Sequence, residues 1–255
     1  MISSINSSFK RQIPLPCIDD LINGIFVEEC KNRFLCKVLI NGIEELCYVA
    51  SSAHLSSFLE LNGKTVLLAE NKGKNTRTHY TLIAVKIALG YVMLNLNLVN
   101  YCVAEALKHE GKRYSCPQRE KKVASGYKCD LYYEGEAPTM VEAKAVLSEH
   151  KTVVFPSVHG FRVAEQLTSI KAALLAGYRV RYCLVILTPT VEHVELTDNS
   201  DFLSRFANCL NAGMCIDIYR IRVTQRRRFY IFHDELLEQE LRDSLLGLVV
   251  DEHVE

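Results

Sequence analysis

Two short segments separated by a turn constrain this chain more than any other part of its sequence. Residues 128–133 and 140–144 are rich in aromatic and β-branched side chains, and residues 134–138 contain the Gly and Pro that interrupt a strand. In a hairpin whose paired residue numbers sum to 272, Asp130 lies opposite Glu142. Side chains alternate between the faces of a strand, so Lys144 shares the face of Glu142. The pattern predicts two carboxylates and a lysine on one face of a sheet.

The composition is that of a soluble globular protein. Of its 255 residues 49% are hydrophobic and 24% are charged, and no run approaches the roughly 20 apolar residues of a membrane span. The N-terminus lacks the apolar run of a secretory signal. The ten cysteines include no Cys-x-x-Cys pair, so we expect buried, reduced thiols in a cytoplasmic protein that has no membrane partner.

The net charge of zero is a cancellation between two parts of the chain. Residues 234–255 hold eight acids and one arginine, a balance of −7, which leaves +7 on residues 1–233. Residues 108–128 alone hold seven lysines and arginines against two acids. This basic stretch either follows a phosphate backbone or forms a solvated loop.

The order of predicted elements divides the chain into two domains and a tail. Five short strands between residues 25 and 85, with Asn41-Gly42 as a hairpin turn, favour an OB-like β-barrel over residues 13–88. Strands and helices then alternate, which predicts an α/β domain with crossover connections over residues 89–233 and an α+β character overall. The later elements are helices over 97–109, 161–176 and 200–210, and strands over 182–187 and 215–223. Residues 234–255 form an acidic C-terminal helix and tail.

This order resembles the SfsA family (sugar fermentation stimulation proteins), which joins an OB-like domain to a PD-(D/E)XK nuclease-like domain. Asp130, eleven further residues, and then Glu142-X-Lys144 form the motif of that nuclease superfamily. The other matching positions, in family order, are residues 24–27, 32–35, 78–82, 95–100, 103–107, Phe155-Pro156, Arg162 and Leu167. The resemblance covers residues 23–223. It implies a divalent-metal-dependent nuclease acting on DNA or RNA, and the alternative is a non-catalytic DNA-binding regulator of sugar metabolism genes. A protein-interaction role is a third possibility.

The chain also departs from the family pattern. A His-Cys-Pro-Asn-Thr-Gly-Arg stretch is replaced at residues 48–54, and Ala145 stands where asparagine is usual. After Arg162 the family's Gly-Gln-Lys-His-Leu is replaced, so that Glu165 stands for a lysine and Gln166 for a histidine. These changes weaken phosphate contacts and predict a divergent member that keeps its acidic cluster.

Asp130, Glu142 and Lys144 are therefore the predicted catalytic residues. Asp130, Glu142 and the Ala143 carbonyl are expected to hold Mg²⁺ or Mn²⁺, because these hard ions prefer oxygen ligands. Lys144 would orient the nucleophile and offset charge; an ordinary surface ion pair is the alternative. Because facing carboxylates repel without a cation, Glu142→Gln is predicted to leave the metal-free fold as stable or slightly more stable.

The predicted contacts to nucleic acid are Lys121, Lys122, Lys128 and Arg162. Glu120 is either a further acid of the metal site or part of a local ion pair. Residues 226–228, three arginines at a hairpin tip, are interpreted as a charged turn that stays solvated. The leucines of the tail have helical spacing, and their face could pack on the body, form a homodimer contact or lie across the basic stretch.

Overall fold

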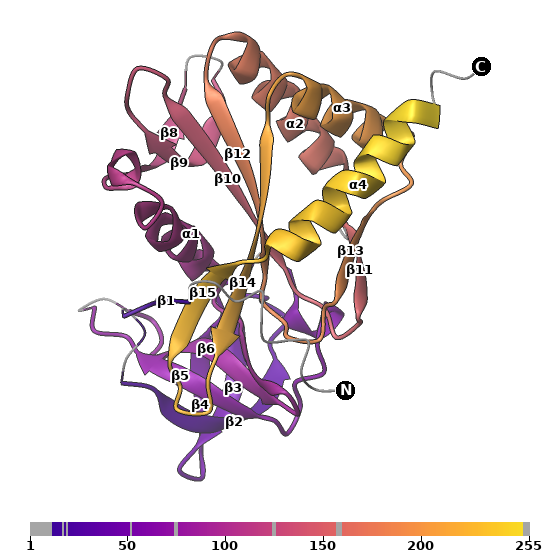
Figure 1. Cartoon of the computed structure of the whole chain (residues 1–255). Coiled ribbons are helices and arrows are strands. Elements are labelled where there is room, and N and C mark those ends of the chain that lie inside the picture. The colour runs from indigo at the N-terminus through magenta and orange to yellow at the C-terminus, as the bar shows by residue number, and fades with distance from the viewer. Residues whose placement is uncertain are drawn as a thin grey trace.

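Five strands close into a small barrel in the N-terminal part of the computed structural model, which describes residues 12–16, 18, 20–51, 53–73, 76–123, 126–156 and 160–251 (Figure 1). The strands are β2 (Ile22–Glu29), β3 (Leu35–Ile40), β4 (Ile43–Tyr48), β5 (Thr65–Glu70) and β6 (Tyr80–Ile87). Four antiparallel pairs run through β2–β3, β3–β4, β2–β5 and β5–β6, and a parallel pair between β4 and β6 closes the barrel. This is the predicted OB-like arrangement.

The hairpin turn between β3 and β4 shows how the sequence directs this barrel. Asn41 and Gly42 have φ values of 51° and 84°, which few residue types adopt as readily as Asn and Gly. Inward-facing side chains such as Phe26, Val38 and Leu68 fill the barrel and are almost fully buried. The predicted turn is confirmed.

The second part is built on three parallel strands. β12 (Arg179–Ile186) lies between β10 (Thr139–Val146) and β14 (Cys215–Val223), and helices α2 (Gly160–Leu175) and α3 (Ser200–Asn211) make the crossovers. β9 (Lys128–Tyr133) and β8 (Gln118–Lys122) extend the sheet beyond β10, and β15 (Phe229–His233) pairs with β14. The predicted α/β domain with crossover connections is confirmed.

The remaining elements connect and cover this framework. They are β1 (Ile13–Pro14), β7 (Gly90–Met93), α1 (Val99–Lys108), β11 (Thr152–Phe155), β13 (His193–Leu196), α4 (Glu235–Asp251) and short 3-10 turns at Leu55–Ser57, Leu96–Leu98 and Lys112–Tyr114. β7 pairs with β6 of the barrel and with β14 of the second part, so one hydrogen-bonded sheet runs through both. Five short strands, β1, β7, β8, β11 and β13, have no counterpart among the predicted elements.

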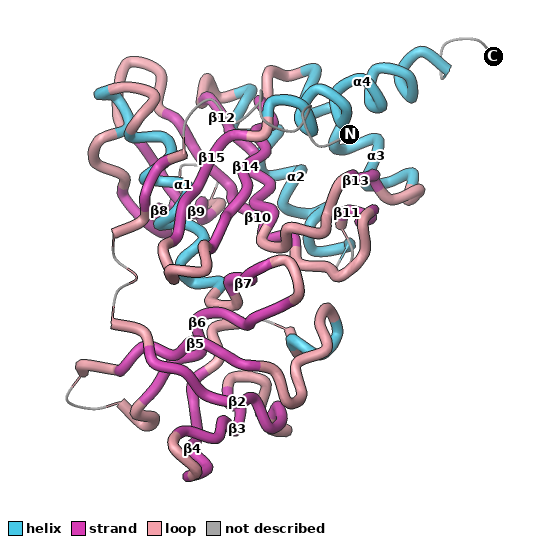
Figure 2. Tube along the Cα trace, turned by 60° about the horizontal axis from the view of Figure 1, so that its bottom comes forward, coloured by secondary structure: helices cyan, strands magenta, loops and turns pink. Residues whose placement is uncertain are grey.

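The large sheet carries a hydrophobic core on each face. Tyr182 and Leu184 of β12 pack toward α2 and α3, whereas Cys183 and Val185 belong to the core shared with α1 and the barrel. Figure 2 shows α2, α3 and α4 together, with α1 apart from them. Burial on both faces explains the continuous apolar run of β12.

The C-terminal helix α4 packs on the body of the protein. Leu237, Leu241 and Leu245 are buried in the core beside α2 and α3, whereas Leu236 points outward and is 62% exposed. Of the three roles considered for the tail leucines, packing on the body is confirmed. Within the part of the chain that the structure describes, no helix is long and apolar enough to cross a membrane.

The cysteines fit the expectation of reduced thiols. Cys36, Cys47, Cys129, Cys183 and Cys209 are buried thiols that form no disulfide. Burial raises the pKa of Cys129 to about 11, and it also raises the pKa of Cys209 to about 11. The thiols of Cys129 and Cys209 are therefore protonated near neutral pH and behave as small apolar side chains.

Candidate metal and nucleic-acid site

Strands β9 and β10 pair in the predicted register. Tyr133 faces Thr139, Tyr132 faces Met140 and Leu131 faces Val141, so each pair of numbers sums to 272. The ladder of paired residues stops before Asp130, whose Oδ2 instead accepts a hydrogen bond from the Ala143 amide at 2.8 Å. The side chain of Asp130 thus takes the place of a strand carbonyl, directly beside Glu142.

Glu142 is buried, with 4% of its surface exposed. The Lys144 ammonium donates to Oε1 of Glu142 at 2.6 Å, and the Tyr127 hydroxyl donates to Oε2 at 2.5 Å. Lys144 also donates to the Gln166 side-chain oxygen of α2 at 2.8 Å. The structure therefore brings the hairpin acids, Lys144 and the position of the family's histidine into one hydrogen-bonded group.

The pKa shifts of Asp130 and Glu142 indicate that a cation beside the two carboxylates would stabilise their charged forms. Burial raises the pKa of Glu142, and the charge of Asp130 raises it further, although Lys144 and Tyr127 oppose the shift. Burial likewise raises the pKa of Asp130, against the Ala143 amide and the charge of Lys144. One lysine thus only partly offsets the charges of a buried carboxylate and a half-buried one.

The donor set fits a hard divalent ion. Oδ1 of Asp130 accepts a hydrogen bond from the side-chain amide of Asn100 on α1 at 3.1 Å. Each of the four carboxylate oxygens of Asp130 and Glu142 therefore has one protein donor. A carboxylate oxygen has two lone pairs, so each oxygen keeps a lone pair for a metal. The role of the Ala143 carbonyl as a third ligand stays a prediction.

A cavity of about 390 Å³ opens beside the pair, between the barrel and the α/β domain. Asp130, Lys144 and Arg162 line it on one side, and Ser51 and Phe58 line it on the barrel side. Glu142 does not line this cavity. Asp130 and Lys144 are therefore accessible from the cavity, whereas Glu142 is buried behind them.

The predicted nucleic-acid residues lie on two elements. Lys121 and Lys122 are exposed on β8, and the Lys121 ammonium lies 5.8 Å from the centre of the Tyr132 ring. Lys128 is exposed on the adjacent β9, and Arg162 is exposed on α2 at the cavity. One alternative for residues 108–128 was a solvated loop, and this is wrong for residues 118–122. These residues form the edge strand β8, because their backbone groups pair with those of β9.

Glu120 forms an ion pair, which is one of the two roles considered for it. Its carboxylate pairs with Lys128 at 2.5 Å, and its charge also raises the pKa of Asp130. Its φ of 53° lies in the left-handed region, which is uncommon for a residue other than Gly, Asn or Asp. Glu120 is therefore an ion-paired acid within electrostatic reach of the site.

Three residues that contact the acids and the lysine of the site were not predicted from the sequence: Asn100, Tyr127 and Gln166. Gln166 could have been predicted as a site residue, because it occupies the position of a histidine in the family pattern. Burial and the charge of Glu142 raise the pKa of Tyr127, so its hydroxyl stays protonated and can donate. No local spacing links Asn100 or Tyr127 to the pair.

A second group of possible metal ligands lies on β14, β15 and α4. One ligand atom from each of Asp217, His233 and Glu238 lies within 4.8 Å of the others. The Asp217 carboxylate already binds the Arg181 guanidinium through two bonds of 2.8 and 2.7 Å, and His233 contacts Glu238 at 2.6 Å. This group is an internally paired charge network.

The barrel, the crossover-connected sheet and the acidic hairpin define a class of two-domain protein with an OB-like domain and a restriction-endonuclease-like α/β domain. Residues 29–94 match the family model for the SfsA N-terminal OB domain, and residues 94–227 match that for the sugar fermentation stimulation protein RE domain. The chain belongs to the SfsA family.

Known relatives are distant in sequence. A sugar fermentation stimulation protein homolog of Caldivirga maquilingensis is 28% identical over 214 residues, which cover 80% of this chain and 90% of the relative. A homolog of Desulfitobacterium hafniense strain Y51 is 28% identical over 157 residues, 61% of this chain and 68% of the relative. The solved structure of Pyrococcus furiosus SfsA in complex with Ca²⁺ shares the fold, with a TM-score of 0.70 and 18% identity over 85% of this chain and 95% of that chain.

Proposed function

We propose that this protein is a divalent-metal-dependent nuclease that hydrolyses phosphodiester bonds in DNA or RNA. The observation that carries the proposal is the buried Glu142 held by Lys144 at 2.6 Å, next to the carboxylate of Asp130. The Pyrococcus furiosus protein was solved in complex with Ca²⁺, which supports a divalent ion in this fold. Mg²⁺ or Mn²⁺ is the proposed working ion, because nucleases need an ion that activates water.

Asp130 and Glu142 would hold the ion, with the Ala143 carbonyl as a further ligand. When bound, it would lower the pKa of a water molecule and offset charge on the phosphate. Lys144 holds its ammonium between Glu142 and Gln166, so it can orient the attacking water. Arg162 lines the same cavity and can bind a phosphate oxygen.

Lys121, Lys122 and Lys128 extend the proposed contact surface away from the cavity. They lie on the two outermost strands of the sheet on the side of the acidic hairpin. Lysines of this kind position a phosphate backbone without reading its sequence. We therefore expect the affinity for nucleic acid to fall steeply as the salt concentration rises.

A second candidate is a non-catalytic DNA-binding regulator of sugar metabolism genes. The observation in its favour is that every carboxylate oxygen of Asp130 and Glu142 already has a protein donor. In addition, Lys144 and Tyr127 contact Glu142, which does not line the cavity. For this candidate the ion pair is structural, and binding needs no metal.

Cleavage of end-labelled single-stranded and duplex DNA and RNA, with Mg²⁺, Mn²⁺ or EDTA, separates the two candidates. The nuclease predicts metal-dependent products that Glu142→Gln and Lys144→Ala abolish. Glu136→Gln, on the turn of the same hairpin, is the matched control and should cleave like the parent protein. Intact substrate under all conditions, together with salt-sensitive binding in EDTA, would establish the regulator instead.

A further inference from the structure

Three consecutive arginines form the tip of the hairpin between β14 and β15. The Thr224 amide donates to the Arg228 carbonyl, and the Arg227 amide donates to the Thr224 carbonyl, both at 2.9 Å. These bonds leave Arg227 with a φ of 60°, in a turn position that normally takes Gly. A side chain with a Cβ is disfavoured there by about 1–2 kcal/mol, so a large cation at this point has a compensating role.

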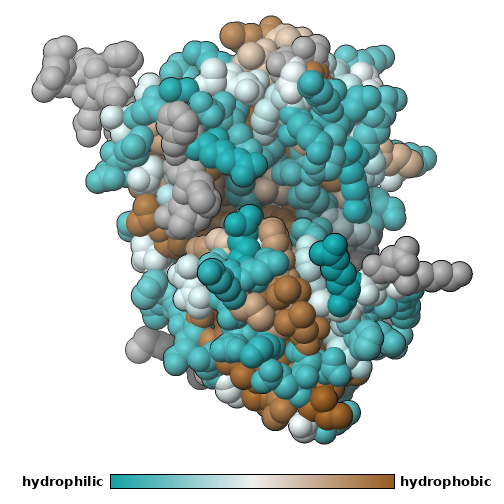
Figure 3. Space-filling model, turned by 180° about the vertical axis from the view of Figure 1, so that it is seen from behind, coloured by the Kyte–Doolittle hydropathy of each residue, from teal (hydrophilic) through white to brown (hydrophobic). Residues whose placement is uncertain are grey.

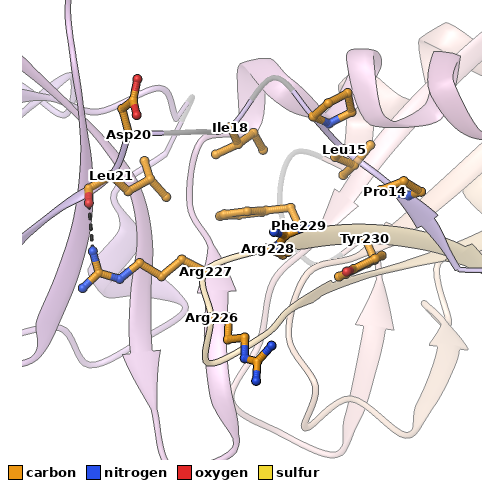
Figure 4. Close-up of a pocket in the computed structure, with 11 residues that line it drawn as sticks. Pro14, Leu15, Ile18, Asp20, Leu21, Arg226, Arg227, Arg228, Phe229 and Tyr230 are labelled. Atoms are coloured by element: carbon orange, nitrogen blue, oxygen red, sulfur yellow. Dashed lines mark hydrogen bonds between the residues drawn. The ribbon is translucent and has the colours of Figure 1, made fainter.

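The contact of Arg227 shows part of that role. Its guanidinium donates to the Leu21 carbonyl at 2.8 Å, so it ties the hairpin tip to the chain that enters β2 (Figure 4). Asp20, the neighbour of Leu21, also has a left-handed φ, of 55°. Two of the four non-glycine residues with positive φ in the described ranges thus lie at this one junction.

The junction encloses a cavity of about 540 Å³, which falls within the usual range for small-molecule sites. Figure 4 shows the Phe229 ring beneath Ile18 and Leu15, which form the apolar side. Arg226 and Arg228, both exposed, line the hairpin side. The cavity therefore combines an apolar wall with cations at its rim.

Two of the three arginines have no acidic partner in the described part of the chain. Neither the Arg226 nor the Arg228 guanidinium has an ion pair or a side-chain hydrogen bond with any residue that the structure describes. Among the described residues, Asp20 is the one acid that lines the cavity, and its weak pair with Lys72, at 3.9 Å, joins two highly exposed side chains. The three arginines and one aspartate among the described lining residues sum to a charge of +2.

We propose that this cavity binds a phosphomonoester. A terminal phosphate carries about −1.5 to −2 charges at neutral pH, which matches the site, whereas each phosphodiester of a nucleic-acid backbone carries one. Arginine forks bind phosphate oxygens in pairs, and the apolar wall accepts the organic body of the ligand. The phosphate belongs to a small molecule or to the phosphorylated end of a nucleic-acid strand.

The experiment measures binding of four probes to the full chain by calorimetry: AMP, adenosine, and one oligonucleotide with a 5′-phosphate or a 5′-hydroxyl. We expect AMP to bind and adenosine not to bind. Arg228→Gln should weaken AMP roughly tenfold, and Arg226→Gln/Arg228→Gln about a hundredfold, as for the loss of charged hydrogen bonds. Arg222→Gln removes a charge from the same hairpin outside the cavity and should bind like the parent.

The oligonucleotide arms identify the source of the phosphate. Tighter binding of the 5′-phosphorylated strand, lost in the double variant, assigns the site to a strand end, whereas AMP binding without this preference assigns it to a small molecule. Absence of binding by both AMP and the phosphorylated strand at millimolar concentration would overturn the proposal. Affinities unchanged in the double variant, with thermal melts showing a folded protein, would also overturn it.

Discussion

Binding of Mn²⁺ between Asp130 and Glu142 should appear directly as added stability. An ion at a hundred times its Kd that binds only the folded state stabilises that state by about 2.7 kcal/mol. For a chain of 255 residues this corresponds to a rise of roughly 5–10 °C in Tm, measured by scanning calorimetry with and without metal. Lys144→Ala should keep the rise, because the lysine is no ligand, whereas Glu142→Gln should abolish it.

The same pair of variants tests the metal-free state, and here the structure reverses the expectation from sequence. Repulsion between the carboxylates alone predicts that Glu142→Gln is neutral or stabilising. However, Glu142 forms a buried ion pair with Lys144, so its neutralisation leaves the ammonium with Gln166 as its partner. We therefore expect Glu142→Gln to lower the free energy of unfolding by about 1–3 kcal/mol without metal.

The second ligand group supplies the control for this experiment. His233→Gln removes the only imidazole of the group formed with Asp217 and Glu238 and should leave the Mn²⁺-induced rise intact. If His233→Gln abolishes the rise and Glu142→Gln does not, the ion binds at the second group. If millimolar Mn²⁺ produces no rise in the parent protein, the metal site on the hairpin does not exist.

Charges and packing lead to three further predictions. Replacing Lys121 and Lys122 by Ala should reduce the slope of log affinity against log salt for duplex DNA by up to about 1.8, since each phosphate contact contributes about 0.9; an unchanged slope in a filter-binding titration would remove β8 from the interface. A hydrogen bond to Glu238 on α4 raises the pKa of His233. The charged His233 therefore contributes its full stabilisation of the fold below the ordinary histidine pKa of 6.5, and this contribution is lost as the pH rises through the raised pKa. In urea unfolding, His233→Gln should flatten the pH dependence of stability above pH 6.5, and a parent protein that loses no stability there would contradict the prediction. Leu241→Ala should cost about 2–5 kcal/mol because it opens a cavity in the core, whereas the exposed Leu236→Ala should change stability by less than about 0.5 kcal/mol; equal melting temperatures would show that α4 does not pack there.

The acidic hairpin could be predicted in detail because its information is local. The register of β9 and β10 follows from a turn of known position and from side-chain alternation, and the three observed pairs obey it. The barrel strands and the helices α2 and α3 were also accessible, since their periodicities and turn residues are strong. Gly177 ends α2 with a φ of 88°, as its position at the end of the apolar pattern predicts.

The partners of the site could not be predicted, because they come from elsewhere in the chain. Asn100 lies on α1, Tyr127 lies before β9, and Gln166 lies on α2, so their convergence depends on how whole elements pack. Strand β8 was missed for a related reason. Its side chains are almost all polar and exposed, so pairing with β9 rather than burial makes it a strand.

The apolar surface of the barrel is another feature that no motif predicts. Ile25, Leu39, Ile43 and Leu46 are exposed on β2, β3 and β4, and Figure 3 shows apolar surface gathered over the barrel. Single exposed apolar residues are ordinary, but neighbouring ones on adjacent strands make a coherent surface. The alternation of apolar and polar residues predicts the strands. Which apolar side chains point outward, however, depends on how the strands close into a barrel.

The single sheet that runs through both parts governs how this protein can be divided and how it unfolds. Strand β7 ends one residue before position 94, where the two family models meet, yet it pairs with β6 on one side and with β14 on the other. A fragment cut at residue 94 would expose the end of β14 near Val223, and one ending at residue 227 would also lose β15. The two family models therefore divide the chain into two evolutionary units, whereas the backbone hydrogen bonds of β7 join these units into one sheet. We expect the whole chain to unfold in a single cooperative transition.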